Sequence, residues 1–172
     1  MTEPGPVRAW LSLGSNVTPQ IQIASAIEAL SARFGELTVS TIYESMAVGF
    51  SGENFLNLVV GIKTQLSPQA LVAVLREIEM SHGRVRGGEK FSSRTLDIDL
   101  LTYGDQIIDQ GSLQVPRDEI LRYAFVLLPL SEVAGNERHP QTGQTYRDLW
   151  EAFDHSEQPL WPVTPMSGDP ID

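Results

Sequence analysis

The sequence contains no cysteine. This absence excludes disulfide scaffolds, thiolate metal sites, iron–sulfur clusters and cysteine nucleophiles. The sequence also lacks any apolar run near the roughly 20 residues that a membrane-spanning helix needs. Residues 1–8 do not show the basic and then apolar pattern of a secretion signal. We therefore expect a cytoplasmic protein with no membrane partner.

Basic residues are outnumbered, with 12 Lys and Arg against 22 Asp and Glu, which gives a net charge of -10. Such a charge disfavours general attraction to nucleic acid or to anionic membranes, so any anion site must be local. A length of 172 residues with 41% hydrophobic residues predicts one compact domain, which we place at residues 1–154. Residues 155–172 hold four of the eleven prolines and are expected to form a tail. The oligomeric state is open, with a monomer favoured.

The spacing of apolar residues predicts the element order βαββαβ in the first 103 residues. The expected strands cover residues 7–13, 37–47, 55–64 and 96–103, and the expected helices cover about 19–34 and 67–82. This order is typical of a ferredoxin-like α+β sandwich, in which helices pack on one face of an antiparallel sheet. Further along the chain we expect a short strand at 106–108, a turn near Pro116, and helices around 125–133 and 146–153.

A short basic segment lies between the second helix and the last strand of that order. Residues 84–94 contain four bases, including Arg84 and Arg94, and one acid, which gives this segment a charge of +3. Two adjacent glycines beside the bases suit a lid that wraps phosphate oxygens, because Arg offers a planar fork of donors. A solvated surface loop explains the same composition.

Asp97 and Asp99 lie two residues apart on a predicted strand, so both carboxylates face the same side of the sheet. Two such carboxylates repel each other unless a cation lies between them, and Mg²⁺ held against a polyphosphate suits this donor pair. Ordinary alternation of polar and apolar residues is the other explanation. Together with the basic segment, the two acids point to phosphoryl-type transfer.

Three other residues allow both a structural and a binding interpretation. Asn57 is an amide between apolar strand residues, and it either bridges structural groups or binds a heterocycle. Phe55 and Phe125 are either core residues or stacking partners of a ligand. The three histidines have no ligand-like spacing, so a histidine metal site is not expected.

Over about residues 9–135 the chain resembles the 6-hydroxymethyl-7,8-dihydropterin pyrophosphokinase family. The segments that carry the resemblance are LSLGSN at 11–16, NFLN at 54–57, GRVR at 83–86, SRTLDIDLLTYG at 93–104 and AFVLLPLSEVAG at 124–135. The resemblance implies a ferredoxin-like fold and transfer of diphosphate from ATP to the pterin alcohol in folate biosynthesis, which releases AMP. Two lids, at 48–54 and 84–94, would exclude water.

Position by position, the resemblance also implies roles for individual residues. It assigns Asp97 and Asp99 to two Mg²⁺ ions, and catalysis to these acids with Arg84 and Arg94. The implied ATP contacts are Glu79, Arg84, Arg94, Ile98 and Arg117. The implied pterin contacts are Ser45, Val48, Phe55, Asn57 and Phe125.

Some positions depart from the family pattern. Arg117 stands where the family usually has His, and Tyr123 stands where it usually has Arg. These departures leave a second hypothesis, a catalytically weakened or substrate-shifted paralogue that binds pterin or nucleotide. An RNA-binding ferredoxin-like domain is a third, which the charge of -10 disfavours.

Overall fold

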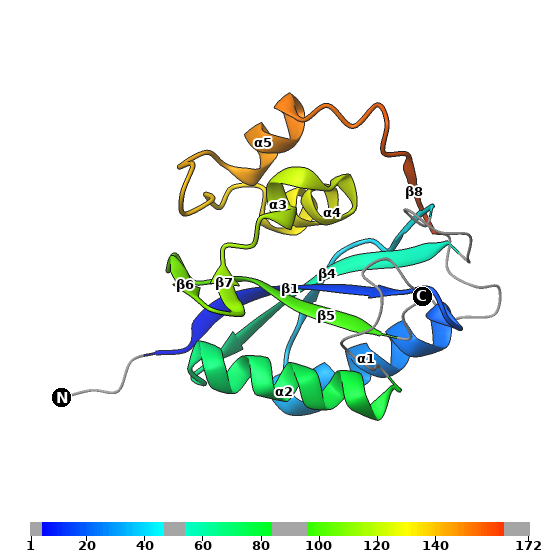
Figure 1. Cartoon of the computed structure of the whole chain (residues 1–172), viewed down its shortest axis with the longest axis vertical. Helices are drawn as coiled ribbons and strands as arrows, with labels where there is room; N and C mark the ends of the chain where they lie inside the picture. Colours follow the sequence, from blue (N-terminus) through cyan, green and yellow to red (C-terminus); the bar gives the residue numbers. More distant parts are fainter. Residues whose placement is uncertain (1–4, 47–53, 84–95, 164–172) are drawn as a thin grey trace.

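The computed structural model describes residues 5–46, 54–83 and 96–163 (Figure 1). Its strands are β1 (Val7–Ser15), β2 (Thr38–Val39), β3 (Tyr43–Ser45), β4 (Phe55–Thr64), β5 (Asp97–Tyr103), β6 (Ile108–Gln110), β7 (Leu113–Val115) and β8 (Leu160–Pro162). Its helices are α1 (Pro19–Phe34), α2 (Pro68–Ser81), α3 (Glu119–Arg122), α4 (Ala124–Ala134) and α5 (Tyr146–Ala152). Within the described residues, no helix combines the length and apolarity needed to cross a bilayer.

One antiparallel sheet organises the described chain. Its strand order is β5-β1-β4-β3-β8, and the short β2 also pairs with β4. The first strand thus lies between the third and fourth long strands of the βαββαβ order, which confirms the predicted ferredoxin-like arrangement. Strands β6 and β7 form a separate antiparallel ribbon.

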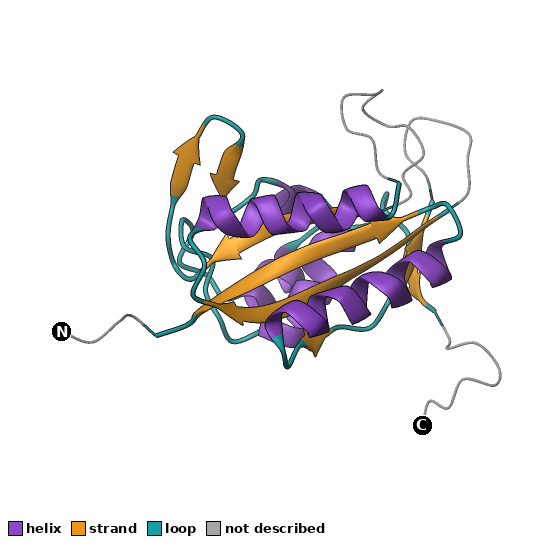
Figure 2. Ribbon diagram, turned by 90° about the horizontal axis from the view of Figure 1, so that it is seen from below, coloured by secondary structure: helices purple, strands orange, loops and turns teal. Residues whose placement is uncertain are grey.

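Helices cover both faces of the sheet, whereas the sequence predicted helices on one face. Helices α1 and α2 lie against one face, and α3, α4 and α5 lie on the other (Figures 1 and 2). The second face is covered because Trp10, Val59 and Leu101 make it apolar, and these buried residues form a second core with residues of α4. Burying this patch requires a partner layer, which the C-terminal third of the chain supplies.

The predicted termini of the two long helices agree with the structure. Pro19 begins α1, and Gly35 follows it with φ of 82°, a conformation that favours glycine. Pro68 begins α2, where the side chain of Ser67 accepts a hydrogen bond of 3.1 Å from the N–H of Ala70.

The single strand expected at 37–47 is divided into β2 and β3. Ser40 lies between them, and its hydroxyl oxygen accepts the N–H of Val59 at 2.9 Å. The Ser40 side chain therefore accepts a hydrogen bond that a backbone carbonyl would accept in a continuous strand. The backbone N–H of the next residue, Thr41, donates to the carboxylate of Glu132 on α4.

The region after β5 differs most from the prediction. The short strand expected at 106–108 is instead β6, and the sequence analysis did not predict β7 and α3, which have three and four residues. Elements this short contain too few residues for a periodic signal. Strand β8 was also not predicted and lies inside the segment expected as a tail, where it pairs with β3. The helices expected at 125–133 and 146–153 are confirmed as α4 and α5.

Candidate active site

A row of residues crosses the sheet on the face that carries α4. In the antiparallel register Asp97 pairs with Gly14, and Gly14 pairs with Asn57 on the next strand. Paired residues of antiparallel strands project to the same side. The acid predicted for metal binding and the amide predicted for pterin binding therefore share one face, with a glycine between them.

Asp99 lies on the same face as Asp97, one step further along β5, where it pairs with Ser12. Between the two acids, Ile98 is fully buried in the core under α1 and α2. The side chain of Asp99 is 21% exposed. The alternation predicted from the sequence is thus confirmed, and both carboxylates face away from the α1–α2 core.

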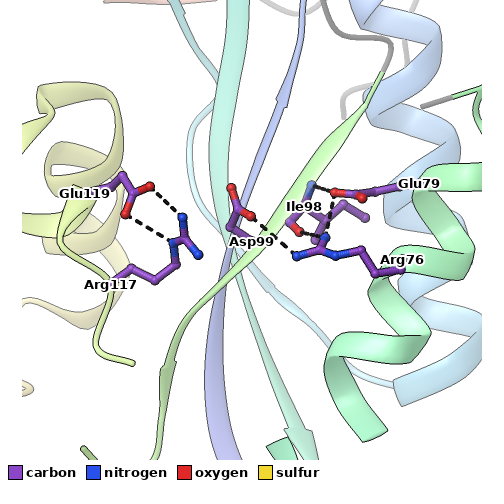
Figure 3. Close-up of polar contacts among 6 residues, drawn as sticks. All are labelled: Arg76, Glu79, Ile98, Asp99, Arg117 and Glu119. Atoms are coloured by element: carbon purple, nitrogen blue, oxygen red, sulfur yellow. Dashed lines mark hydrogen bonds and ion pairs between the residues drawn. The ribbon is translucent and has the colours of Figure 1, made fainter. Parts of the chain in front are cut away.

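Two arginines flank Asp99 from opposite sides (Figure 3). Arg76 on α2 places its Nη2 atom 3.8 Å from Oδ1 of Asp99. On the other side, the backbone N–H of Arg117 donates to the carbonyl of Leu101 at 3.0 Å, which fixes Arg117 beside β5. Asp99 thus lies between two guanidinium groups within a protein of net charge -10.

The guanidinium of Arg117 has a carboxylate partner of its own. Its Nε and Nη2 atoms donate to the two oxygens of Glu119 at 3.1 and 2.6 Å. Burial alone would lower the pKa of Arg117, but this hydrogen bond and the charges of Asp99, Glu119 and Asp97 outweigh it and raise the pKa. Burial likewise opposes the ionised form of Glu119, and the bond to Arg117 overrides it and lowers the pKa of Glu119. Arg117 therefore lies within electrostatic reach of both acids.

Glu79, a predicted nucleotide contact, holds the backbone of the edge strand β5. Its carboxylate is 1% exposed, and Oε2 accepts the N–H of Ile98 at 2.7 Å. Arg76 donates from Nη1 to the same carboxylate at 2.9 Å and to the carbonyl of Ile98 at 2.9 Å. The two side chains thus satisfy both backbone groups of Ile98. A contact between Glu79 or Ile98 and nucleotide stays a prediction.

Asn57 is 4% exposed, and its Nδ2 donates to the hydroxyl of Ser45 at 3.1 Å. Two predicted pterin residues are therefore in direct contact. A Cβ atom at Gly14 would lie 2.9 Å from Oδ1 of Asn57. Gly14 thus gives the amide room to lie over β1, a role that the sequence analysis missed although the LSLGSN segment contains this glycine.

The aromatic residues come from two elements that face this row. Phe55 begins β4 and pairs with Ser45, so both project to the same face as Asn57. On α4, the ring of Phe125 stacks on Tyr123 with centroids 5.1 Å apart and an interplanar angle of 15°. Tyr123, one of the departures from the family pattern, therefore extends the aromatic surface of Phe125.

Some predicted residues lie outside the described part of the chain. They are Val48, Arg84 and Arg94, together with most of the two expected lids. In the described ranges, no group of three or more His, Asp or Glu residues forms a metal cluster. A pair of carboxylates nevertheless fits Mg²⁺, which proteins usually hold through one or two carboxylates plus substrate phosphates and water.

Sequence comparison identifies relatives along most of the chain. Residues 10–135 match the family model of 7,8-dihydro-6-hydroxymethylpterin-pyrophosphokinase. A Synechocystis 2-amino-4-hydroxy-6-hydroxymethyldihydropteridine pyrophosphokinase is 37% identical over 91% of this chain and 80% of its own length. The Aquifex aeolicus protein of the same name is 40% identical over 76% of this chain and 82% of its own length.

Structural comparison supports the fold independently. The wild-type HPPK-DHPS of Plasmodium falciparum superposes with a TM-score of 0.65 at 15% sequence identity. The superposition covers 87% of this chain, which spans 45% of that longer chain. Because the family model matches 126 residues and the relatives align over most of the sequence, the chain belongs to the 7,8-dihydro-6-hydroxymethylpterin-pyrophosphokinase family.

Proposed function

We propose that the protein transfers diphosphate from ATP to 6-hydroxymethyl-7,8-dihydropterin in folate biosynthesis, giving the pterin diphosphate and AMP. The names of the relatives support this activity. The observation that carries it is the row Asp97, Gly14 and Asn57 on one sheet face. This row sets a carboxylate suited to metal-bound phosphate beside an amide suited to a heterocycle.

Asp97 and Asp99 form the phosphate half of the proposed site. Their oxygens would hold two Mg²⁺ ions, which when bound neutralise the charge of the ATP phosphates. Arg117 adds a guanidinium, which is protonated at its ordinary pKa, and the carboxylates around it raise that pKa further. We assign further phosphate contacts to Arg84 and Arg94 from the family resemblance.

Ser45, Phe55, Asn57 and Phe125 form the pterin half, and we add Val48 from the resemblance. An amide offers two donor hydrogens and one acceptor oxygen, so the bond between Asn57 and Ser45 uses only one of these groups. The amide is held in place by that bond and is suited to an edge with both donors and acceptors. The rings of Phe55 and Phe125 would stack on the flat heterocycle.

In the proposed reaction, the hydroxymethyl oxygen of the pterin attacks the β-phosphorus of ATP. A bond forms between this oxygen and the β-phosphorus, while the bond from the β-phosphorus to the oxygen of the α-phosphate breaks. AMP leaves with that oxygen, and the proton of the hydroxyl group is released. Positioning and charge neutralisation supply most of the rate in such transfers, which suits a site of fixed carboxylates and guanidinium groups.

A weakened or substrate-shifted paralogue is the second candidate function. Two observations favour it, since Arg117 is engaged by Glu119 and Tyr123 stacks on Phe125 instead of offering a cation. A displaced guanidinium loses much of its effect, because an error of about 1 Å can reduce a rate on the order of 10²-fold.

Incubation with ATP, Mg²⁺ and 6-hydroxymethyl-7,8-dihydropterin tests the proposal, with AMP and the pterin diphosphate separated by chromatography. We expect both products in equal amounts, and no AMP when the pterin is omitted. Binding of pterin or ATP without AMP formation would favour the paralogue. Absence of both binding and turnover would contradict both candidates.

A further inference from the structure

Residues 155–163, which we term the C-terminal strap, follow α5 and lead to β8 at the edge of the sheet (Figure 1). The strap lies beyond residues 10–135, where the family model matches. Its strand β8 pairs antiparallel with β3, and the N–H of Val163 donates to the carbonyl of Ile42 at 2.9 Å. It thus joins the strand that carries Ser45.

At its other end, the strap holds the start of α4 through Gln158. Oε1 of Gln158 accepts the N–H of Ala124 at 2.8 Å, and Nε2 donates to the carbonyl of Arg122 at 3.1 Å. The N-cap residue Tyr123 makes no side-chain cap bond of its own. Gln158, which lies 34 positions after Ala124, therefore caps this helix and holds the backbone on both sides of Tyr123. Phe125 is the next residue along the helix after Ala124.

The strap also reaches the segment that carries the other phenylalanine. Nε1 of Trp161 donates to Oε1 of Glu44 at 3.2 Å, and Oε2 of Glu44 accepts Nδ2 of Asn54 at 3.0 Å. Asn54 directly precedes Phe55 at the start of β4. One nine-residue segment is thus connected by side-chain hydrogen bonds to the backbone beside Phe125 and to the residue beside Phe55.

We propose that Gln158 and Trp161 are positioning residues that set the relative placement of Phe125 and Phe55, and through it the affinity for pterin. The proposal rests on the proposed function, since it requires that these two rings bind the pterin. In the described sheet, β8 lies at the edge opposite β5, which carries the two carboxylates, so we expect affinity for ATP not to depend on the strap. Comparing a variant's affinity for pterin with its affinity for ATP therefore distinguishes a positioning role from a general loss of stability.

Gln158→Met tests the α4 end, because methionine keeps the length of the side chain and removes both hydrogen bonds. We expect the Kd for pterin, measured by calorimetry with an ATP analogue bound, to rise about 5-fold, the effect of losing about one hydrogen bond. We expect the Kd for the ATP analogue alone to stay unchanged. Hydrogen exchange at the amide of Ala124 should become faster. Gln20→Met, an exposed position on α1 across the sheet, is the matched control and should change neither affinity.

Trp161→Phe tests the other end, because it removes only the N–H that reaches Glu44 and keeps a ring on β8. It should also weaken pterin binding and leave ATP binding unchanged. In a Phe125→Leu background, Gln158→Met should have a smaller effect on pterin affinity than in the wild type, since the ring that it positions is gone.

These measurements separate failure of the inference from failure of the proposed function. If the wild type binds pterin and both strap variants bind it equally well, the positioning role is wrong. Equal losses of pterin and ATP affinity, or additivity with Phe125→Leu, would also overturn it. If the wild type binds no pterin, the proposed function and the inference fall together.

Discussion

Gly14 shows how the site depends on a missing side chain. It lies between Asp97 and Asn57 in the register, and the amide oxygen of Asn57 occupies the space where a Cβ would project. Because the sheet provides fixed spacing between strands, a glycine here leaves room for the amide on the same face as Asp97.

Gly14→Ala should impair pterin binding more than it impairs stability. The new Cβ would lie 2.9 Å from Oδ1 of Asn57, and the end of a side chain can move more easily than backbone. We expect the Kd for pterin to rise about 10-fold as the amide is displaced from its bonds. Gly61→Ala is the contrast, because its Cβ would collide with the buried ring of Trp10. It should cost about 1–3 kcal/mol in unfolding free energy without a selective effect on pterin.

Equal effects of the two glycine substitutions on pterin affinity, after correction for the folded fraction, would contradict the role of Gly14. Unfolding in urea gives that fraction for each variant. Trp10 lies in the second core, against which Phe125 also packs, so the two glycine variants are compared only after this correction.

Asp97→Ala should abolish turnover while the fold persists. The carboxylate is half-buried on a strand face, and its removal also relieves repulsion with Asp99. We expect AMP formation to fall by at least about 10²- to 10³-fold, the effect typical of removing one electrostatic contact to a transition state. Asp105→Ala, an exposed acid just after β5, should keep the wild-type rate. A normal rate in the Asp97 variant would remove the metal assignment.

At the scale of single elements, β5 lies at one edge of the described sheet and depends on α2. An edge strand has backbone groups that lack a neighbouring strand, and buried groups of this kind need other partners. Arg76 and Glu79 supply them for Ile98, the residue between the two acids. The same arginine lies 3.8 Å from Asp99, so one helix turn sets both the backbone of β5 and the charge beside it.

Arg76→Ala should destabilise the protein by about 2 kcal/mol. It removes a cation at 2.9 Å from a carboxylate that is 1% exposed, and losing one partner of a buried ion pair costs about 3–5 kcal/mol. We expect less because the side chain of Arg76 is 30% exposed and solvent screens part of the interaction. Urea unfolding measures the change, with Arg33→Ala on the exposed part of α1 as the control.

A second substitution tests whether the pair is the cause. In the Arg76→Ala background, Glu79→Leu should recover part of the lost stability, because an apolar residue no longer needs a cation in the buried position. Purely additive losses in the double variant would contradict the ion-pair explanation.

Long periodic elements could be predicted from the sequence, and short or long-range features could not. The strands around Leu58 and Ile98 and the helices α1 and α2 follow from apolar spacing and from their Pro and Gly ends. The break at Ser40 depends on a hydrogen bond to Val59, and β8 depends on pairing with β3, so neither has a local signal.

The same contrast between local and long-range features applies to the candidate site. The alternation of Asp97 and Asp99 is a local property of a strand and could be predicted. Gly14 and Arg76 become site residues only through the strand register and the packing of α2, which composition does not reveal. The assignments of Arg84, Arg94 and Val48 stay predictions, since these residues lie outside the described ranges.

At the scale of the whole molecule, the sheet has one hydrophobic core on each of its two faces. The larger core joins the sheet to α1 and α2, and the second core joins it to α4 and α5. The predicted substrate residues Asp97, Asn57 and Phe55 project to the second face, which is the face that the C-terminal third covers. The strap connects the start of α4 to β3.

The turn between α4 and α5 closes this second core and contains a buried histidine. His139 is 1% exposed, and its Nδ1 accepts the N–H groups of Gln141 and Thr142 at 3.1 and 3.2 Å. Protonation of Nδ1 would convert this acceptor into a donor that faces two other donors. Burial lowers the pKa of His139 below its ordinary value of 6.5. The folded state therefore binds this proton less readily than the unfolded state.

The unfolding free energy should accordingly decrease as the pH falls from about 7.5 to 5.5. In the unfolded chain His139 takes up a proton near its ordinary pKa of 6.5, while in the folded chain it does so only at lower pH. The unfolded state thus binds more protons in this window, and stability falls by up to about 1.4 kcal/mol per pH unit. Urea unfolding at several pH values measures the slope. His139→Gln should reduce it, whereas His155→Gln, at an exposed position, should preserve it. A wild-type slope in the His139 variant would show that another group carries the dependence.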